Sequence, residues 1–236
     1  MSPHRTTATL AGVFFVVAAV AAIIGLALYQ PLLHDPTAYV TGSGNDASIF
    51  LGAFFEVLVV ISVIGTAVTL FPVVRKQSEG FAVGYLAGRT VEGVVIAVGI
   101  MSLLTAVTLR QGYTGADAAA YVVAAKSLVA LHNWTFLLGP NIALGVNTTL
   151  LATLMLRSGL VPRWIPIVGF AGGPLIFVSG IAEMFGLYSQ VSTVGAITAL
   201  PVFAWEMSLA VWMIVRGFRP VPILDAEPRI RGAVAA

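Results

Sequence analysis

The sequence predicts an all-α protein, a bundle of six transmembrane helices arranged as three hairpins, with both termini in the cytoplasm. Two observations support this fold class. The 236 residues are 58% hydrophobic and 9% charged, whereas a soluble domain has about 25% charged residues. Long uncharged apolar runs also recur along the whole chain, and about 20 apolar residues are enough for a helix to cross the hydrocarbon core of a bilayer.

Six apolar segments are long enough to be spans. They cover residues 8–29, 48–74, 81–109, 130–156, 164–187 and 191–215, within a transmembrane domain of residues 8–216. The apolar core of the first run is longer than the roughly 7–15 residues of a signal peptide, so we expect it to be retained. Residues 1–7 then form a cytoplasmic N-terminus, and residues 217–236, in which prolines alternate with charges, form a flexible cytoplasmic tail.

Turn-forming and charged residues separate the spans. Residues 30–47 hold two prolines, two glycines and two aspartates, and predict a loop. Residues 77–80 form a short turn after the basic pair that ends the second span. The apolar segment up to 129 carries Lys126. A single helix from about Asp117 to Arg157 would be about 60 Å long, twice the hydrocarbon thickness. We therefore expect this segment to lie at the interface, before the fourth span.

The last three spans contain helix-bending residues. Pro140 should kink the fourth span, because proline lacks an N–H and clashes with the preceding turn. A tight turn at residues 158–163 leads to the fifth span. This span contains Gly169, Gly172, Gly173, Pro174 and Gly180 and should be bent and closely packed. The sixth span ends at Arg216.

Basic residues predict the orientation. One side of the membrane would hold Arg5, Arg75, Lys76, Arg157, Arg163, Arg216, Arg219, Arg229 and Arg231, and the other only Arg110 and Lys126. Cytoplasmic loops carry the excess of Lys and Arg. Both termini should therefore be cytoplasmic, which agrees with an even number of spans.

The third span carries a charged pair at its middle. Arg89 and Glu92 lie three residues apart, so they are neighbours on one helix face. The same face continues through Tyr85, Gly88, Ile96 and Gly99. A charged residue at that depth costs roughly 2.5–3.5 kcal/mol on insertion scales and normally faces protein with a partner. This face should therefore point into the bundle.

Acidic residues inside the spans outnumber the one arginine that could neutralise them. Four glutamates lie within spans, and a single guanidinium can pair with only part of this set. The others must be protonated, lie near a surface or surround something polar, and a protonated carboxyl group can act as a general acid. The candidate catalytic residues are Glu92, Glu206 and Glu56. The candidate ligand-binding residues are Arg89, His132, Asn133, Asn147, Glu183 and Tyr85. The alternative is that these groups only fix the packing of the helices.

Several chemistries find little support in the sequence. The absence of cysteine excludes disulfides, thiol nucleophiles and thiolate metal sites. A zinc site would need at least three protein ligands, whereas only His132 lies in a span and no HExxH spacing occurs. We expect no metal and no cofactor, since a haem would need a second membrane histidine and a retinal a lysine within a span. A net charge of +2 without a basic patch does not predict nucleic-acid binding.

Short motifs in a fixed order resemble a known family. They are Ala11-Gly12, Glu56, Leu70-Phe71-Pro72-Val73, Arg89-Thr90-Val91-Glu92, His132-Asn133, Arg157 to Pro162, Glu206, Trp212 and Gly217. Over about residues 8–218 the chain resembles the bacterial integral-membrane proteins grouped as domain of unknown function 4386. The resemblance implies six or seven spans and marks Glu56, Arg89, Glu92, His132 and Glu206 as the site, but it assigns no function.

Three functions remain open. The first is a polar intramembrane pocket that binds, and acts by acid–base chemistry on, a small lipid-like molecule such as an isoprenoid. The second is a proton-coupled transporter or channel subunit for a small solute, with protonatable glutamates as the relay. The third is a structural or signalling subunit. All three place the chain in a bacterial cytoplasmic membrane, in contact with lipid and open to oligomer formation.

Overall fold

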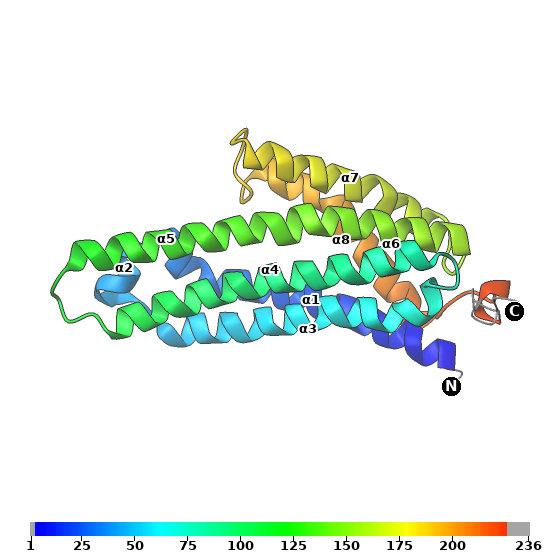
Figure 1. Ribbon diagram of the computed structural model, residues 1–236, viewed down its shortest axis with the longest axis horizontal. Coiled ribbons are helices and arrows are strands. Elements are labelled where there is room, and N and C mark those ends of the chain that lie inside the picture. The colour runs from blue at the N-terminus through cyan, green and yellow to red at the C-terminus, as the bar shows by residue number, and fades with distance from the viewer. Residues whose placement is uncertain (1–2, 226–236) are drawn as a thin grey trace, which may run out of the picture.

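The computed structural model of the protein describes residues 3–225, and this part of the chain is helical and contains no strand (Figure 1). Six long helical stretches account for most of it. They are α1 (Pro3–His34), α3 (Asp46–Val74), α4 (Glu79–Gln111), the run of α5 (Ala118–Leu137), η2 (Leu138–Ala143) and α6 (Leu144–Ser158), α7 (Trp164–Met184) and α8 (Thr193–Val215). A short helix, α2 (Pro36–Ala38), a π-turn, η1 (Tyr39–Ser43), and a 3-10 turn, η3 (Pro222–Leu224), complete the order.

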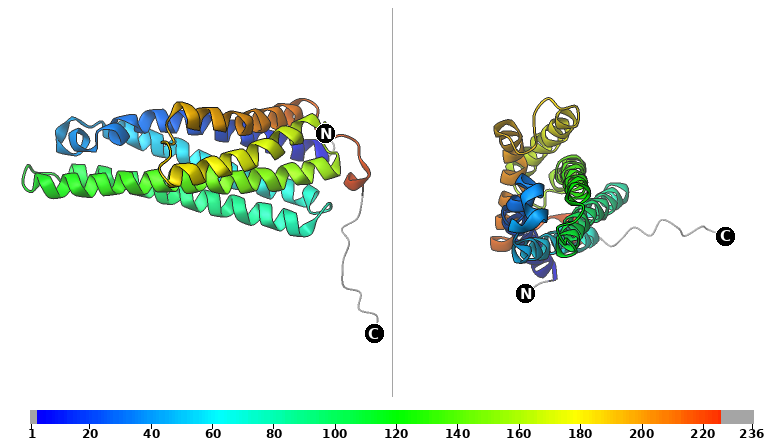
Figure 2. Two further views of the ribbon diagram at one scale, coloured as in Figure 1. Left: turned by 90° about the horizontal axis from the view of Figure 1, so that it is seen from above. Right: turned by 90° about the vertical axis from the view of Figure 1, so that its left-hand side faces the viewer.

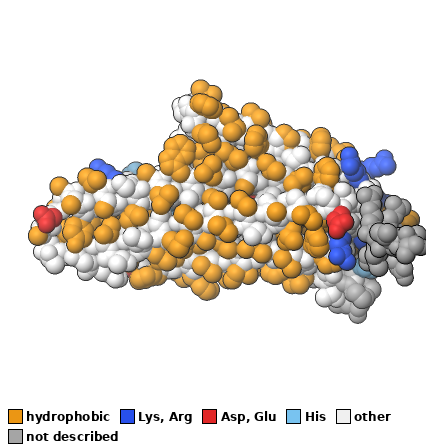
Figure 3. Space-filling view, viewed as in Figure 1, with side chains coloured by type: hydrophobic (Ala, Val, Ile, Leu, Met, Phe, Trp, Pro, Cys, Tyr) orange, Lys and Arg blue, Asp and Glu red, His pale blue; other side chains and the backbone are white. Residues whose placement is uncertain are grey.

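These six stretches are long and apolar enough to cross a membrane. Hydrophobic side chains cover the flank of the molecule, and most of the visible charged ones lie at its two ends (Figure 3). The predicted fold class is therefore confirmed: the protein is an all-α, multi-pass membrane protein with six spans. Both ends of the described chain lie at the same end of the bundle (Figure 1).

The spans pack as a ring. In order around it, α1 contacts α3, α3 contacts α4, α4 contacts α6, α6 contacts α7, α7 contacts α8, and α8 returns to α1. Figure 2, seen along the bundle, shows this arrangement of helices around a common axis. Glycines allow two of the closest approaches. A methyl group at Gly12 would meet the backbone of Ala210, 2.8 Å away, and one at Gly145 would meet the backbone of Gly173, also 2.8 Å away.

The connection after the first span is shorter than the loop expected at 30–47. Helix α1 continues to His34, with Pro31 inside its final turns. The chain then makes α2 and η1 before α3 begins at Asp46, where the Asn45 side chain accepts a hydrogen bond from the Ser48 backbone N–H at 3.4 Å. Gly42, one of the two glycines on which the loop prediction rests, lies in this compact turn. Its φ is 146°, a conformation that residues with a side chain disfavour.

The expected interfacial segment and the fourth span form one helical run of 41 residues, from Ala118 to Ser158. Pro140 does not end the helix. It lies in the π-turn η2, where the backbone widens to accommodate the ring. The N-terminal half of the run extends beyond the shorter helices α7 and α8 (Figure 1) and packs against α2, η1 and α4. One side of this extension therefore lies against protein, whereas Val123, Lys126 and Leu131 on the other side are exposed.

The first residues of the expected flexible tail are folded against the bundle. The backbone N–H of Arg219 donates to the carbonyl oxygen of Leu160 at 2.8 Å, and Lys76 Nζ donates to that of Leu224 at 2.9 Å. Phe218, Val221 and Ile223 pack on the core. The rest of the predicted tail, residues 226–236, lies outside the described residues, as do residues 1–2 of the predicted N-terminus.

Candidate functional site

The charged pair of the third span lies at the centre of a buried cluster. Arg89 Nη1 donates to both carboxylate oxygens of Glu92, at 3.1 and 3.3 Å, as their spacing on α4 predicts. Arg89 Nη2 donates to Glu206 Oε1 on α8 at 2.8 Å. Asn147 Nδ2 on α6 donates to Glu92 Oε2 at 2.7 Å. We call Arg89, Glu92, Glu206 and Asn147 the Arg89 cluster.

The Arg89 cluster connects opposite sides of the ring. Helix α4 packs on α3, α5 and α6, and helix α8 packs on α1 and α7. The long side chain of Arg89 therefore crosses the interior to reach Glu206. The whole polar face predicted on α4 is buried apart from Gly88, which is partly buried. A Cβ at Gly88 would collide with the Asn147 amide, so this glycine allows Asn147 to approach Glu92.

Aromatic rings and one hydroxyl pair surround the guanidinium. It lies over the rings of Phe15 and Tyr85, 5.7 Å from each centroid, in cation–π geometry. The Tyr85 hydroxyl lies 3.3 Å from that of Thr66. Arg89 and Glu92 are each 3% exposed, whereas the Glu206 side chain is 17% exposed. One guanidinium therefore serves two carboxyl groups, of which only Glu206 approaches the surface.

Glu56 and His132 line a separate cavity of about 40 Å³. Its other walls are Ala22, Val59, Ile96, Gly99, Thr135, Phe136 and Pro140. A cavity of this size accommodates about one water molecule. We call it the Glu56 cavity. It is the place in the described structure where a carboxyl group and an imidazole face the same space.

Helix packing determines the positions of both groups. Glu56 packs on Gly25, where a Cβ would lie 3.1 Å from its Cγ. The Tyr29 phenol, one turn further along α1, lies beside the Glu56 carboxyl. The Tyr29 ring also packs edge-on against the His132 ring at 5.7 Å, while Phe136 stacks on the imidazole at 6.0 Å. Tyr29 therefore contacts both ionisable groups of the cavity.

Glu183 belongs to a third cluster near the α7–α8 connection. Its carboxylate accepts from Asn141 Nδ2 at 2.7 Å and from the Ser179 hydroxyl at 2.9 Å. Tyr188 donates to Ser179 at 2.8 Å, and Gln190 donates to Asn141 Oδ1 at 3.0 Å. Both oxygens of Glu183 thus have partners, and this arrangement joins α7 to the π-turn η2 of the fourth span.

The candidate residues therefore do not surround one common cavity. Arg89, Glu92, Glu206, Asn147 and Tyr85 come together at the ring centre, Glu56 and His132 form the separate cavity, and Glu183 lies in the third cluster. Asn133 is exposed, and its Oδ1 is 3.5 Å from His132 Nδ1. Within residues 3–225 no group of three His, Cys, Asp or Glu side chains lies close enough to hold a metal.

Sequence patterns do not identify two residues near these clusters. Tyr29 has the position of an ordinary residue at the end of the first span, and no pattern pairs it with Glu56. Gln190 lies in the connection between α7 and α8, yet it donates to the Phe136 carbonyl oxygen at 3.0 Å. The sequence does contain one signal for this contact. Pro140 has no N–H to donate to the carbonyl oxygen of Phe136, four positions earlier, so this oxygen needs another donor.

Comparison with known proteins shows that one family model matches all six spans. The model, described as Domain of unknown function (DUF4386), matches residues 10–217, from the first span to the end of the sixth. It is the family that the sequence motifs resemble. Neither a curated protein nor a solved structure matches the chain.

Proposed function

The chain belongs to the family described as Domain of unknown function (DUF4386), and we propose that it binds a small lipid-like molecule and transfers protons to it at the Glu56 cavity. The supporting observation is that Glu56 and His132 line the same space. We place the protein in a bacterial cytoplasmic membrane, with its termini in the cytoplasm, on the distribution of Lys and Arg.

The chemistry follows from having two ionisable groups at one cavity. A protonated Glu56 gives a proton to one carbon of a double bond in the bound molecule, and a neutral His132 takes a proton from the allylic carbon next to the other end of that double bond. The net result is a shift of a double bond, and no oxidant or reductant is needed. Acid–base groups placed in this way contribute about 10²–10⁴-fold to a rate. The Tyr29 phenol lies beside the Glu56 carboxyl group and packs against the His132 ring.

The size of the cavity limits what enters it. A volume of about 40 Å³ admits only the reacting end of a lipid-like molecule. The rest of the molecule stays on the lipid-facing surface, because Ala22 lines the cavity and is exposed there. This route gives a membrane-dissolved substrate access from the bilayer. By contrast, the Arg89 cluster has protein partners for its carboxylates, and we assign it to holding the ring together.

Deuterium exchange tests this function with a mixture of lipids in place of a single chosen substrate. The protein is reconstituted in nanodiscs with a bacterial lipid extract, incubated in D₂O and analysed by mass spectrometry of the extracted lipids. With the wild type we expect at least one lipid to gain deuterium at carbon. With Glu56→Gln or His132→Gln we expect the rate to fall at least about 100-fold.

The matched control is Glu79→Gln, since Glu79 is an exposed glutamate at the start of α4. It should exchange at the wild-type rate. Equal exchange in the wild type and the Glu56→Gln variant would disprove the assigned role of Glu56. No deuterium in any lipid, together with no lipid adduct in native mass spectrometry, would disprove lipid binding and chemistry alike.

A proton-coupled transporter is the second candidate. In its favour, one face of α4 carries both Glu92 and Gly99, seven residues apart, which places the Arg89 cluster about 10 Å along the axis from the Glu56 cavity. Protonatable groups in such a series suit a relay. Flux of small solutes into proteoliposomes under a pH gradient tests it. Flux that depends on the gradient and on Glu56, without deuterium in any lipid, would favour this function instead.

A further inference from the structure

A larger apolar groove lies on α8, away from the Glu56 cavity. Its volume is about 460 Å³, and it is lined by Trp164, Met207, Ser208, Val211, Trp212, Val215 and Arg216. We call it the Trp212 groove. Trp164 comes from the start of α7, and the other residues come from the last two and a half turns of α8. It opens on the lipid-facing side, since Trp164, Val211 and Val215 are 55%, 57% and 61% exposed.

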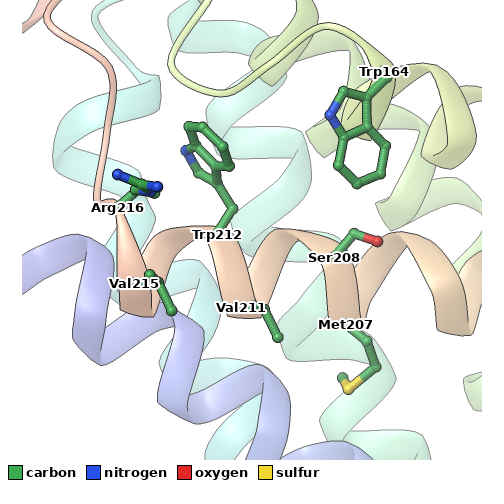
Figure 4. A pocket seen from close by; sticks show the side chains of 7 residues that line it. All are labelled: Trp164, Met207, Ser208, Val211, Trp212, Val215 and Arg216. Carbon is green, nitrogen blue, oxygen red and sulfur yellow. The ribbon is translucent and has the colours of Figure 1, made fainter.

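The groove has an apolar wall and one polar end. Figure 4 shows Trp164 and Trp212 projecting to the same side of α8, with Ser208 between them along the helix and Arg216 beyond Trp212. The nitrogen of Trp212 is on the side of the ring nearer Arg216 (Figure 4). This indole nitrogen is buried and has no hydrogen-bond partner within residues 3–225. Arg216 is therefore the polar group that this end of the groove presents to a ligand.

This end of the molecule is strongly basic. Arg5, Arg75, Lys76, Arg157, Arg163 and Arg219 lie at the same end of the bundle as Arg216. Glu79 and Asp225 are the described acidic residues there. An anion is therefore attracted to the mouth of the groove, at the depth where Trp side chains and lipid headgroups meet.

We propose that the Trp212 groove binds one anionic glycerophospholipid, with an acyl chain along its apolar wall and the headgroup at Arg216. The charge at the mouth favours an anionic headgroup over a neutral or zwitterionic one. The apolar wall explains why a lipid binds here rather than a free phosphate ion. The site is independent of the proposed chemistry at the Glu56 cavity.

Native mass spectrometry of the full-length protein tests the proposal. The wild type is titrated with phosphatidylglycerol and, separately, with phosphatidylcholine. We expect the first phosphatidylglycerol to bind about 10-fold more tightly than phosphatidylcholine. Its net negative charge is attracted by the basic residues at about 1 kcal/mol each, whereas the choline ammonium cancels the phosphate charge. Arg216→Gln should reduce this preference about 5-fold. Trp212→Ala, which removes one wall of the groove, should weaken binding of both lipids several-fold.

Two further variants separate the headgroup from the acyl chain. Ser208→Trp fills the middle of the groove and should weaken binding of both lipids about 10-fold. Lys126→Gln removes an exposed charge from the N-terminal half of α5, away from this end of the bundle, and should have no effect. Gel filtration in detergent confirms that each variant is folded, and Val211→Trp replaces Ser208→Trp if that variant aggregates. Equal affinities in the wild type and Arg216→Gln would overturn the headgroup site. If Arg216→Gln weakens binding of phosphatidylglycerol but the substitutions at Ser208 and Trp212 leave the affinities for both lipids unchanged, the groove is not the acyl site.

Discussion

Gln190 donates a hydrogen bond to the carbonyl oxygen of Phe136 at 3.0 Å, the atom to which an N–H at position 140 would donate in a regular helix. Pro140 supplies no such N–H. The connection between α7 and α8 therefore supports the π-turn η2, in which Pro140 lies. Because Phe136 and Pro140 both line the Glu56 cavity, this single contact also helps to define the shape of that cavity.

Replacement of Gln190 by alanine should destabilise the protein. The change removes the hydrogen bond to Phe136 and a second one, of 3.0 Å, to Asn141. Each net hydrogen bond contributes about 0.5–1.5 kcal/mol, so the free energy of unfolding in detergent should fall by about 1–3 kcal/mol. The control is Gln30→Ala, whose amide donates to Leu26 of its own helix. An equal loss of unfolding free energy in both variants would contradict the proposal that Gln190 stabilises the π-turn η2.

The two carboxyl groups that share Arg89 should show strong energetic coupling. In Glu92→Gln or Glu206→Gln the guanidinium keeps one carboxylate, and we expect losses of about 1–2 kcal/mol each. In the double variant Arg89 is buried without a counter-charge, and such a loss amounts to about 3–5 kcal/mol. A double-mutant cycle of unfolding free energies measures the coupling. Strictly additive losses would show that the two contacts act independently.

The glycine next to Arg89 should not tolerate a methyl group. In Gly88→Ala the new Cβ would collide with the Asn147 amide and displace it from Glu92. Overpacking of this kind costs about 1–3 kcal/mol. Gly84→Ala is the matched control one turn earlier on α4, because its Cβ would meet only Leu150, at 3.6 Å. Thermal unfolding of both variants compares them, and equal melting temperatures would contradict the close packing of Asn147.

Cysteine labelling tests the predicted orientation directly, because the chain has no native cysteine. Ala116→Cys lies in the exposed turn before α5, and Glu79→Cys lies at the exposed start of α4, at the opposite end of the bundle. On intact cells a membrane-impermeant maleimide should label position 116 and leave position 79 unlabelled until the cells are opened. The reverse pattern would place the termini outside the cytoplasm.

Local spacing predicts part of this arrangement and cannot predict the rest. The buried face of α4 and the pairing of Arg89 with Glu92 follow from a three-residue spacing within one helix. The contact of Ser179 with Glu183 follows from a four-residue spacing. The contact of Arg89 with Glu206 joins residues 117 positions apart, and depends on the order of helices around the ring. That order is set by side-chain packing between spans, which periodicity does not encode.

The same reason explains the division of the candidate residues into separate clusters. Composition correctly indicates that the span glutamates need partners, and Glu92, Glu183 and Glu206 have them in Arg89, Asn141, Asn147 and Ser179. It cannot indicate that Glu56 faces His132 and Tyr29, because these residues belong to three different spans. Residues on one helix face are predictable, whereas the choice of facing helix is not.

The three-residue spacing of Arg89 and Glu92 also matters for biogenesis. The two charges neutralise each other within one helix, so α4 already carries its own counter-ion when it leaves the ribosome-bound translocon. Glu206 is synthesised more than a hundred residues later. Membrane insertion of the third span therefore does not need to wait for the last one, and the arrival of α8 completes a site whose first half was inserted well before it.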